Sequence, residues 1–381
     1  MNRFCERCER TTHDGNLWCP EPDCPAEAGY ALFGYGDFLG DLKIIKLVRA
    51  WRTAALYEAQ RGKTPVLVKV AHRGEETEER LSREAHAFKS LMPRPSPIGA
   101  FLASFRPSPR PILLRPLSPY PTPATRPFGQ ISFRGEVKVF SVFQYVKGKL
   151  LSDVLLENPQ LWHSEAAWLI ATIAEAMRPL VAQKKCHLSL TPDVILVEVD
   201  AKGHLRPTLL DLGFLLEGNE MESMADWPRL CEPAYTAPEL LADGRGQRVK
   251  SVNPTADVYS LGLIFYEMLA GRPGFEPKLR RDDRVRELVA KGAGSLPVER
   301  PELEQLGVIK IVDRAIARNN RFNTVTELGE ALTAIYSTPP KERRPRPRRF
   351  YVVIISLMVL FLTVAGVVAY IFWELWQRAV Q

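Results

Sequence analysis

Short apolar runs and longer amphipathic stretches alternate from about residue 36 to residue 337. The runs at residues 65–70, 138–144 and 208–210 have the length and the apolar content of strands. Residues 75–92 instead have the spacing of a helix. Along the chain, strands and a helix come first, more strands follow, and the remainder is mostly helical. This order predicts an α+β domain with a β-rich first part and an α-rich second part.

A different pattern follows the domain. Residues 350–373 form an apolar run without a charged side chain, and aromatic residues stand near both ends of it. A helix of that length spans the ~30 Å hydrocarbon core of a bilayer, with the aromatics at the two interfaces. The run predicts one transmembrane helix. The alternative is a buried core helix, although core helices rarely run this long without polar positions.

The charge distribution adds an orientation to this helix. The net charge is +7, and most of it comes from a Pro/Arg linker at residues 338–349, so the rest of the chain is nearly balanced and does not favour nucleic acid as a partner. Basic residues beside a span mark its cytoplasmic side. We therefore expect a single-pass protein of the cell membrane, with its amino-terminal domains in the cytoplasm and residues 374–381 outside. Five arginines of the linker could also contact anionic lipids: Arg343, Arg344, Arg346, Arg348 and Arg349.

Cysteines are concentrated at the amino terminus, where no secretory signal is visible. Four of the six form a Cys-x2-Cys and a Cys-x4-Cys pair: Cys5, Cys8, Cys19 and Cys24. Two such knuckles can offer four thiolates to one Zn²⁺, so residues 1–28 predict a zinc ribbon in a reducing compartment. The alternative is a disordered tail with coincidental cysteines, and His13 could replace one ligand. A ribbon of this size would serve protein docking as well as nucleic-acid binding.

Several short motifs occur in a fixed order within the domain. Lys69 interrupts the apolar strand at residues 65–70, Glu84 lies on the helix that follows, and Asp211-Leu-Gly213 comes directly after a strand. Each is weak alone, because a strand lysine often faces solvent and an isolated Asp-x-Gly is often a turn. The remaining motifs are His187-Leu-Ser189-Leu-Thr191-Pro192, Ala237-Pro-Glu239, a segment that begins at Asp257, and Arg321 before a helix near Thr324.

In this order the motifs resemble those of the protein kinase superfamily, most closely the bacterial relatives of eukaryotic Ser/Thr kinases. The resemblance covers about residues 44–337 and implies a bilobal fold with a β-rich small lobe and an α-rich large lobe. It implies that Lys69 pairs with Glu84 and with nucleotide phosphates, and that Asp211 holds Mg²⁺. It gives structural roles to four further residues: His187 in the catalytic loop, Asp257 that caps this loop, and the pair Glu239 and Arg321.

The catalytic loop departs from the family's pattern His-Arg-Asp-Leu-Lys-Pro-x-Asn. Ser189 stands at the position of the catalytic aspartate, and a neutral hydroxyl cannot accept the substrate's proton near pH 7. Thr191 replaces the phosphate-neutralising lysine, and Val194 replaces the asparagine that binds the second metal ion. Asp193 could rescue the metal position only if the loop shifts by one residue.

Two other segments also depart from the pattern. Residues 47–59, at the position of the glycine-rich loop, contain no glycine, and Trp51 and Arg52 would crowd the space for phosphates. Eleven of residues 93–127 are proline, which predicts an extended or turned insertion in the small lobe. This insertion could brace the small lobe or present Pro-x-x-Pro ligands.

These observations favour a membrane-anchored pseudokinase that acts through protein partners as a signalling scaffold or a nucleotide-sensing switch, with no residue assigned as catalytic. One alternative is an active Ser/Thr protein kinase, which transfers phosphate from ATP to protein, with a rearranged loop. A second is a zinc-dependent nucleic-acid-binding membrane protein. The expected cofactors are Zn²⁺ at the four cysteines and, where nucleotide binds, ATP with Mg²⁺.

Overall fold

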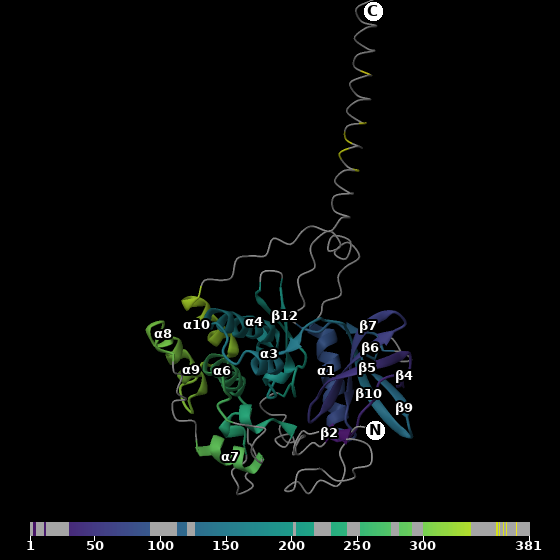
Figure 1. Cartoon of the computed structure of the whole chain (residues 1–381), viewed down its shortest axis with the longest axis horizontal. Helices are drawn as coiled ribbons and strands as arrows, with labels where there is room; N and C mark the ends of the chain where they lie inside the picture. Colours follow the sequence, from purple (N-terminus) through teal and green to yellow (C-terminus); the bar gives the residue numbers. More distant parts are fainter. Residues whose placement is uncertain are drawn as a thin grey trace, which may run out of the picture. The chain divides into compact units, whose positions relative to one another are not determined.

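The computed structural model of the chain describes residues 3–4, 11–12, 30–91, 113–119, 126–200, 203–216, 230–241, 252–275, 282–291 and 300–336, together with residues 356, 358, 361, 363 and 371. Met1–Met92 and Pro111–Thr338 form one compact unit. Within it, most of the labelled strands and the helix α1 (Glu75–Leu91) lie on the right of Figure 1, and most other helices lie on the left. This arrangement confirms the predicted α+β fold with a β-rich and an α-rich lobe.

The small lobe is built on an antiparallel sheet. Its strands follow the order β4-β5-β6-β7-β10-β8, and β9 pairs with the first half of β10. The strands are Phe38–Leu39 (β4), Leu42–Ala50 (β5), Ala54–Arg61 (β6), Thr64–Ala71 (β7), Pro116–Leu117 (β8), Gly129–Phe133 (β9) and Glu136–Gln144 (β10). The helix of this lobe, α1, spans Glu75–Leu91 and ends one residue before its predicted boundary.

One face of this sheet packs against α1. Side chains alternate between the two faces along each strand, so Leu67 and Lys69 of β7 share the face that meets the helix. Leu67 and Phe143 belong to the same buried cluster as Phe88 of α1, and the ring centroids of Phe88 and Phe143 are 5.1 Å apart. The apolar contact therefore holds α1 at a fixed distance from the strand that carries Lys69.

The other face is covered by residues that precede the predicted start of the domain. Leu32 and Phe33 are buried, and Phe33 packs against Tyr57 and Phe133 with ring centroids 5.6 and 4.4 Å apart. The Phe33 amide also donates to the Tyr57 hydroxyl at 3.2 Å. The core of the domain thus begins at Leu32 rather than at residue 36, because this face of the sheet needs an apolar cover.

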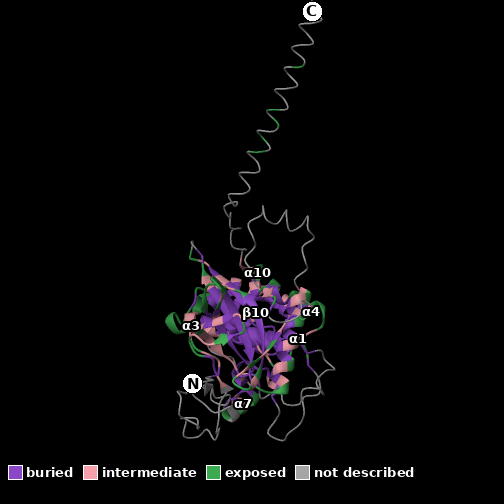
Figure 2. Ribbon diagram, turned by 90° about the vertical axis from the view of Figure 1, so that its right-hand side faces the viewer, coloured by how far each residue is buried: buried purple, intermediate pink, exposed green. Residues whose placement is uncertain are grey.

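The large lobe is assembled around α6. Its helices are α3 (Leu151–Glu157), α4 (His163–Ala182), α6 (Thr255–Ala270), α7 (Asp282–Lys291), α8 (Pro301–Gln305), α9 (Val308–Ile316) and α10 (Val325–Ile335). Nearly every residue of α6 is buried, so it lies at the centre of the core. Gly262 lets α9 pack closely, since a Cβ at this position would lie 2.7 Å from the Ala315 Cβ. Figure 2 shows the buried residues in the interior and the exposed ones at the periphery.

A three-stranded antiparallel sheet places two of the predicted motifs side by side. Its strands are β11 (Lys149–Leu150), β12 (Ile195–Val199) and β13 (Leu205–Leu209), paired in this order. The loop that contains Ser189 leads into β12, and Asp211 follows β13. Because Ile195 pairs with Leu209, the start of β12 and the end of β13 meet at the same edge.

Several predicted segments fall outside the described residues. The four cysteines lie there. Of the same part of the chain, the structure describes β1 (Arg3–Phe4), β2 (Thr11–Thr12) and β3 (Tyr30–Ala31), which pair into a small antiparallel sheet. Most of the proline-rich insertion, the Pro/Arg linker and nearly all of residues 350–373 lie outside as well. No helix among the described residues is long and apolar enough to cross a bilayer. The zinc ribbon and the transmembrane helix stay predictions.

Candidate functional site

A lysine of β7 and a glutamate of α1 meet in the interior of the small lobe. Lys69 and Glu84 are both buried, and the Lys69 ammonium donates to the two Glu84 carboxylate oxygens at 2.9 and 2.7 Å. The structure thus places these two predicted site residues in direct contact. The ion pair joins the sheet to α1, next to the apolar contact with Phe88.

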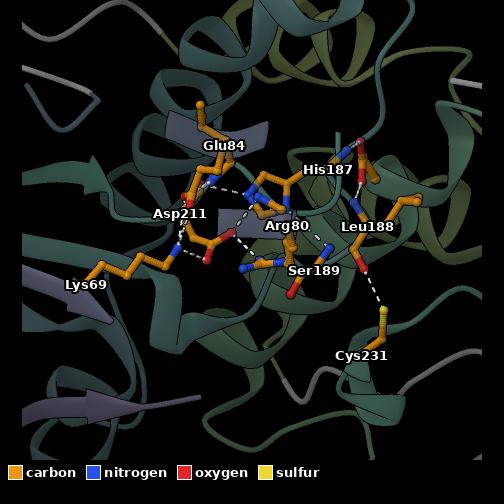
Figure 3. A network of polar contacts seen from close by, with 11 residues as sticks. Lys69, Arg80, Glu84, His187, Leu188, Ser189, Asp211 and Cys231 are labelled. Carbon is orange, nitrogen blue, oxygen red and sulfur yellow. Dashed lines mark hydrogen bonds and ion pairs between the residues drawn. The ribbon is translucent and has the colours of Figure 1, made fainter. Parts of the chain in front are cut away.

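Asp211 occupies the centre of the site (Figure 3). Lys69 donates to one of its carboxylate oxygens, so the ammonium bridges Asp211 and Glu84. Gly213 takes a left-handed φ of 71°, which glycine adopts without strain. A Cβ on Gly213 would collide with the carbonyl oxygen of His187, so this glycine also permits the close approach of two loops.

Arg80 is a residue of this site that the motif analysis missed. It lies on α1 four positions before Glu84, is 2% exposed, and donates to the second carboxylate oxygen of Asp211 at 2.7 Å. Its guanidinium also lies over the Phe214 ring, 4.8 Å from the ring centroid. The only signal in the sequence was helical spacing, since residues four apart share one helix face.

Burial and the neighbouring charges of the cluster shift the pKa values of Asp211, Glu84 and Arg80. Burial disfavours the charged form of Asp211, but Arg80 and Lys69 outweigh burial and hold the pKa of this carboxyl well below its usual range. The pKa of Glu84 is raised, by burial first and by the charge of Asp211 second. Burial also works against the charge of Arg80, yet Asp211 and Glu84 raise its pKa. Glu84 is therefore the less acidic of the two carboxyl groups that share Lys69.

Asp257 fixes the backbone of the loop that contains Ser189. Its two carboxylate oxygens accept hydrogen bonds from the amides of His187 and Leu188, both at 2.7 Å. The His187 ring joins this loop to Asp211, because Nδ1 accepts from the Ser189 amide and Nε2 then donates to the Asp211 carbonyl oxygen at 2.9 Å. Burial lowers the pKa of His187 to about 4, so the ring is neutral near pH 7.

The loop lacks the catalytic aspartate, the lysine and the asparagine of the family's pattern. Ser189 is half-buried, Thr191 is buried, and Val194 belongs to the hydrophobic core of the large lobe. The Asp193 carboxylate pairs with Arg49 of β5 at 2.5 Å. It turns toward the small lobe, so it does not replace the metal ligand that is missing at Val194.

The turn between β5 and β6 covers the site. The Lys69 ammonium lies 5.2 Å from the centre of the Trp51 ring, so the indole takes space that a glycine would leave open. Arg52 pairs with Glu232 of the large lobe at 3.2 Å and ties this turn to it. A cavity of about 400 Å³ lies beside the turn, bordered by the Ser189 loop and α3.

Glu239 and Arg321 hold the large lobe together away from the cleft. The Arg321 guanidinium donates to both Glu239 oxygens, from Nη1 at 2.5 Å and from Nη2 at 3.1 Å. It also lies over the Tyr259 ring of α6, 4.7 Å from the centroid. These contacts join the segment around Glu239 to α6 and to the loop before α10.

The family model described as protein kinase domain matches residues 129–321, which is just over half of the chain. The chain belongs to the protein kinase family. A solved structure of the kinase domain of Mycobacterium tuberculosis PknI superposes with a TM-score of 0.50, covering 80% of this chain and 99% of that one. Their sequence identity is 18%, so this likeness supports the kinase fold alone.

Two bacterial kinases are similar to parts of this kinase chain. The serine/threonine-protein kinase pkn2 of Myxococcus xanthus is 28% identical over 204 residues, which is 51% of this chain and 23% of that protein. The serine/threonine-protein kinase PkaA of Streptomyces coelicolor is 34% identical over 141 residues, 35% of this chain and 23% of that protein. In both cases the chain spans less than a quarter of the relative's length.

Kinase domains generally use ATP with Mg²⁺, and the residues of this domain fit that group only in part. Lys69 and Asp211 stand where they would face phosphates and metal. Both carboxylate oxygens of Asp211, however, already accept from cationic side chains, and Val194 offers no oxygen ligand. Among the described residues, no cluster of three or more acidic, histidine or cysteine side chains is placed to hold a metal ion. As arranged, these side chains do not offer Mg²⁺ the ligands that the family's pattern supplies.

Proposed function

We propose that this chain is a membrane-anchored pseudokinase, a kinase fold that signals through protein partners rather than by phosphoryl transfer. The observation that carries this proposal is Ser189 at the position of the catalytic base. General-base help is worth about 10²–10⁴ in rate, and a serine hydroxyl does not supply it near pH 7. Thr191 and Val194 extend the loss to the phosphate lysine and the second metal ligand.

The contacts that assemble the domain support a scaffold role. The pair Lys69 and Glu84 joins the sheet to α1, and Asp257 holds the backbone of the altered loop. These interactions need no substrate to form. Since the site does not offer Mg²⁺ the ligands of the family's pattern, we favour the scaffold over a nucleotide-sensing switch.

The proposal includes the anchor and the zinc ribbon. Deleting residues 350–373 should release the protein from membranes washed with alkaline carbonate, and a deleted chain that stays bound would contradict the anchor. The arginines of the linker support an orientation with the kinase domain in the cytoplasm. Elemental analysis should find one zinc per chain in the wild type. A variant with Cys5→Ser and Cys8→Ser should lose this zinc. A zinc content that the variant keeps would contradict the ribbon.

Phosphoryl transfer by the full chain, purified in detergent micelles, tests the proposal directly. Labelled ATP, Mg²⁺ or Mn²⁺ and generic protein substrates should give no more labelled product than a Lys69→Ala control. Transfer well above this control would refute the proposal and favour an active Ser/Thr kinase with a rearranged loop. In that case Ser189→Asp should leave the rate nearly unchanged or increase it.

A further inference from the structure

The site contains one more positive charge than the family's pattern requires. That pattern supplies one lysine and two carboxylates, which leaves a charge of −1 for metal and nucleotide to balance. Here Arg80 adds a second cation to Lys69, Glu84 and Asp211, and all four side chains are at most 2% exposed. Two cations and two carboxylates make the buried cluster neutral without any ligand.

Arg80 also takes the atom that a metal ion would use. It donates to one Asp211 oxygen at 2.7 Å, the Gly213 amide donates to the same oxygen, and Lys69 donates to the other. A divalent cation at Oδ1 would have to displace the buried guanidinium of Arg80, and one at Oδ2 would meet the ammonium of Lys69. A displaced guanidinium would be left buried without its partner, which is strongly unfavourable.

We propose that Arg80 takes the place of the divalent cation in this kinase fold. It is a positioning residue that holds α1 and residues 211–213 together in the absence of both metal and nucleotide. The inference rests on the proposed function, because a scaffold that signals by shape must keep this arrangement without a substrate. The inference adds that α1 and residues 211–213 stay together at all times and are not switched by nucleotide.

The position of Arg80 on α1 and a second hydrogen bond to this helix allow Arg80 to act in this way. Helical spacing places Arg80 and Glu84 on the same face of α1, so one helix supplies both the glutamate for Lys69 and the cation for Asp211. The Leu212 amide donates to Glu84 at 2.9 Å, so the segment after Asp211 is bound to α1 twice. Loss of the Arg80 contact should therefore loosen this segment and not only the aspartate.

Hydrogen exchange of the full chain in detergent micelles tests this proposal. The amides of Leu212 and Gly213 donate within the cluster and report directly on its assembly. In the wild type their protection should be the same in EDTA, in Mg²⁺, and in Mg²⁺ with ATP. Arg80→Leu should exchange at least about 10-fold faster at these amides. Arg83→Leu, on the same helix but in an ion pair with Glu79 at the surface, is the matched control and should exchange like the wild type.

Two results would overturn the proposal. One is a several-fold gain in wild-type protection on adding Mg²⁺ with ATP, a measurement that stands even if Arg80→Leu does not fold. The other is an Arg80→Leu protein as protected as the wild type. Arg80→Lys keeps the charge and should recover part of the protection, so no recovery would contradict a role for the charge. Amide protection that rises with Mg²⁺, in a protein that transfers no phosphate, would refute this inference alone. Phosphoryl transfer in the absence of added metal would refute only the proposed function.

Discussion

Replacing Asp257 by alanine should destabilise the domain through two amides. The Asp257 carboxylate is 3% exposed and accepts from the His187 and Leu188 amides at 2.7 Å each. A buried amide left without an acceptor costs about 1–3 kcal/mol, so the loss of both acceptors should cost about 4 kcal/mol. Since about 1 kcal/mol shifts Tm by about 2–4 °C in large domains, Asp257→Ala should lower Tm by about 10 °C.

Thermal unfolding of the full chain, followed by tryptophan fluorescence, measures this change. Glu287→Ala is the control, because Glu287 is 55% exposed and pairs with Arg284 on the surface of α7. Exposed ion pairs contribute about 0–1 kcal/mol, so this control should move Tm by at most about 4 °C. A shift for Asp257→Ala no larger than that of the control would refute the role given to the two amides.

The same residue predicts a dependence on pH. Burial raises the pKa of Asp257 to about 6, against the effect of its two amide hydrogen bonds. Below this pKa the folded state holds a proton that the unfolded chain has not yet bound, so folding becomes more favourable as pH falls. Relative to Asp257→Asn, the wild type should gain about 1.3 kcal/mol of unfolding free energy between pH 7 and pH 5. If the unfolding free energies of the wild type and Asp257→Asn differ by the same amount at pH 7 and pH 5, the raised pKa of Asp257 is contradicted.

Two further substitutions test the loops and the large lobe. Gly213→Ala should lower Tm by about 5 °C or more, because a Cβ meets both a left-handed φ and the His187 carbonyl oxygen; a wild-type Tm would argue against this close approach. Arg321→Lys should lose about 2 kcal/mol in urea unfolding, because lysine cannot donate in parallel to Glu239 or lie over Tyr259 in the same way. Arg284→Lys, at an exposed pair, should change little, and equal losses for the two variants would contradict this reasoning.

Local context made several site residues visible in the sequence. Lys69 lies in an apolar strand, and the alternation of side chains fixes the face on which it lies. Asp211 follows a strand and precedes a glycine two residues on, so both its place and its turn could be inferred. Asp257 lies in the first turn of a helix that is mostly apolar. In each case the neighbouring residues in the chain determine on which side of the strand, turn or helix the side chain lies.

Arg80 and Asp193 could not be assigned in this way. The first three turns of α1 are mostly charged, so the pattern does not say which arginine faces the sheet and which faces solvent. Arg49 and Asp193 are 144 positions apart in the sequence, and their ion pair exists only because the two lobes meet. Leu32 and Phe33 were missed for a related reason, since an apolar pair outside any long periodic segment has no predictable partner.

The anchoring of Leu32 and Phe33 also determines how the amino-terminal segment can move. Ala31 ends β3, and Leu32 is already buried, so a single peptide bond separates the small amino-terminal sheet from the kinase core. A flexible tether would let the two parts swivel independently and would absorb a pull on either one. Without a tether, force applied to strands β1–β3 passes through the buried Phe33 ring to the sheet that carries Lys69. A partner that binds the small amino-terminal sheet would therefore act directly on the sheet of the small lobe, with no flexible linker between them.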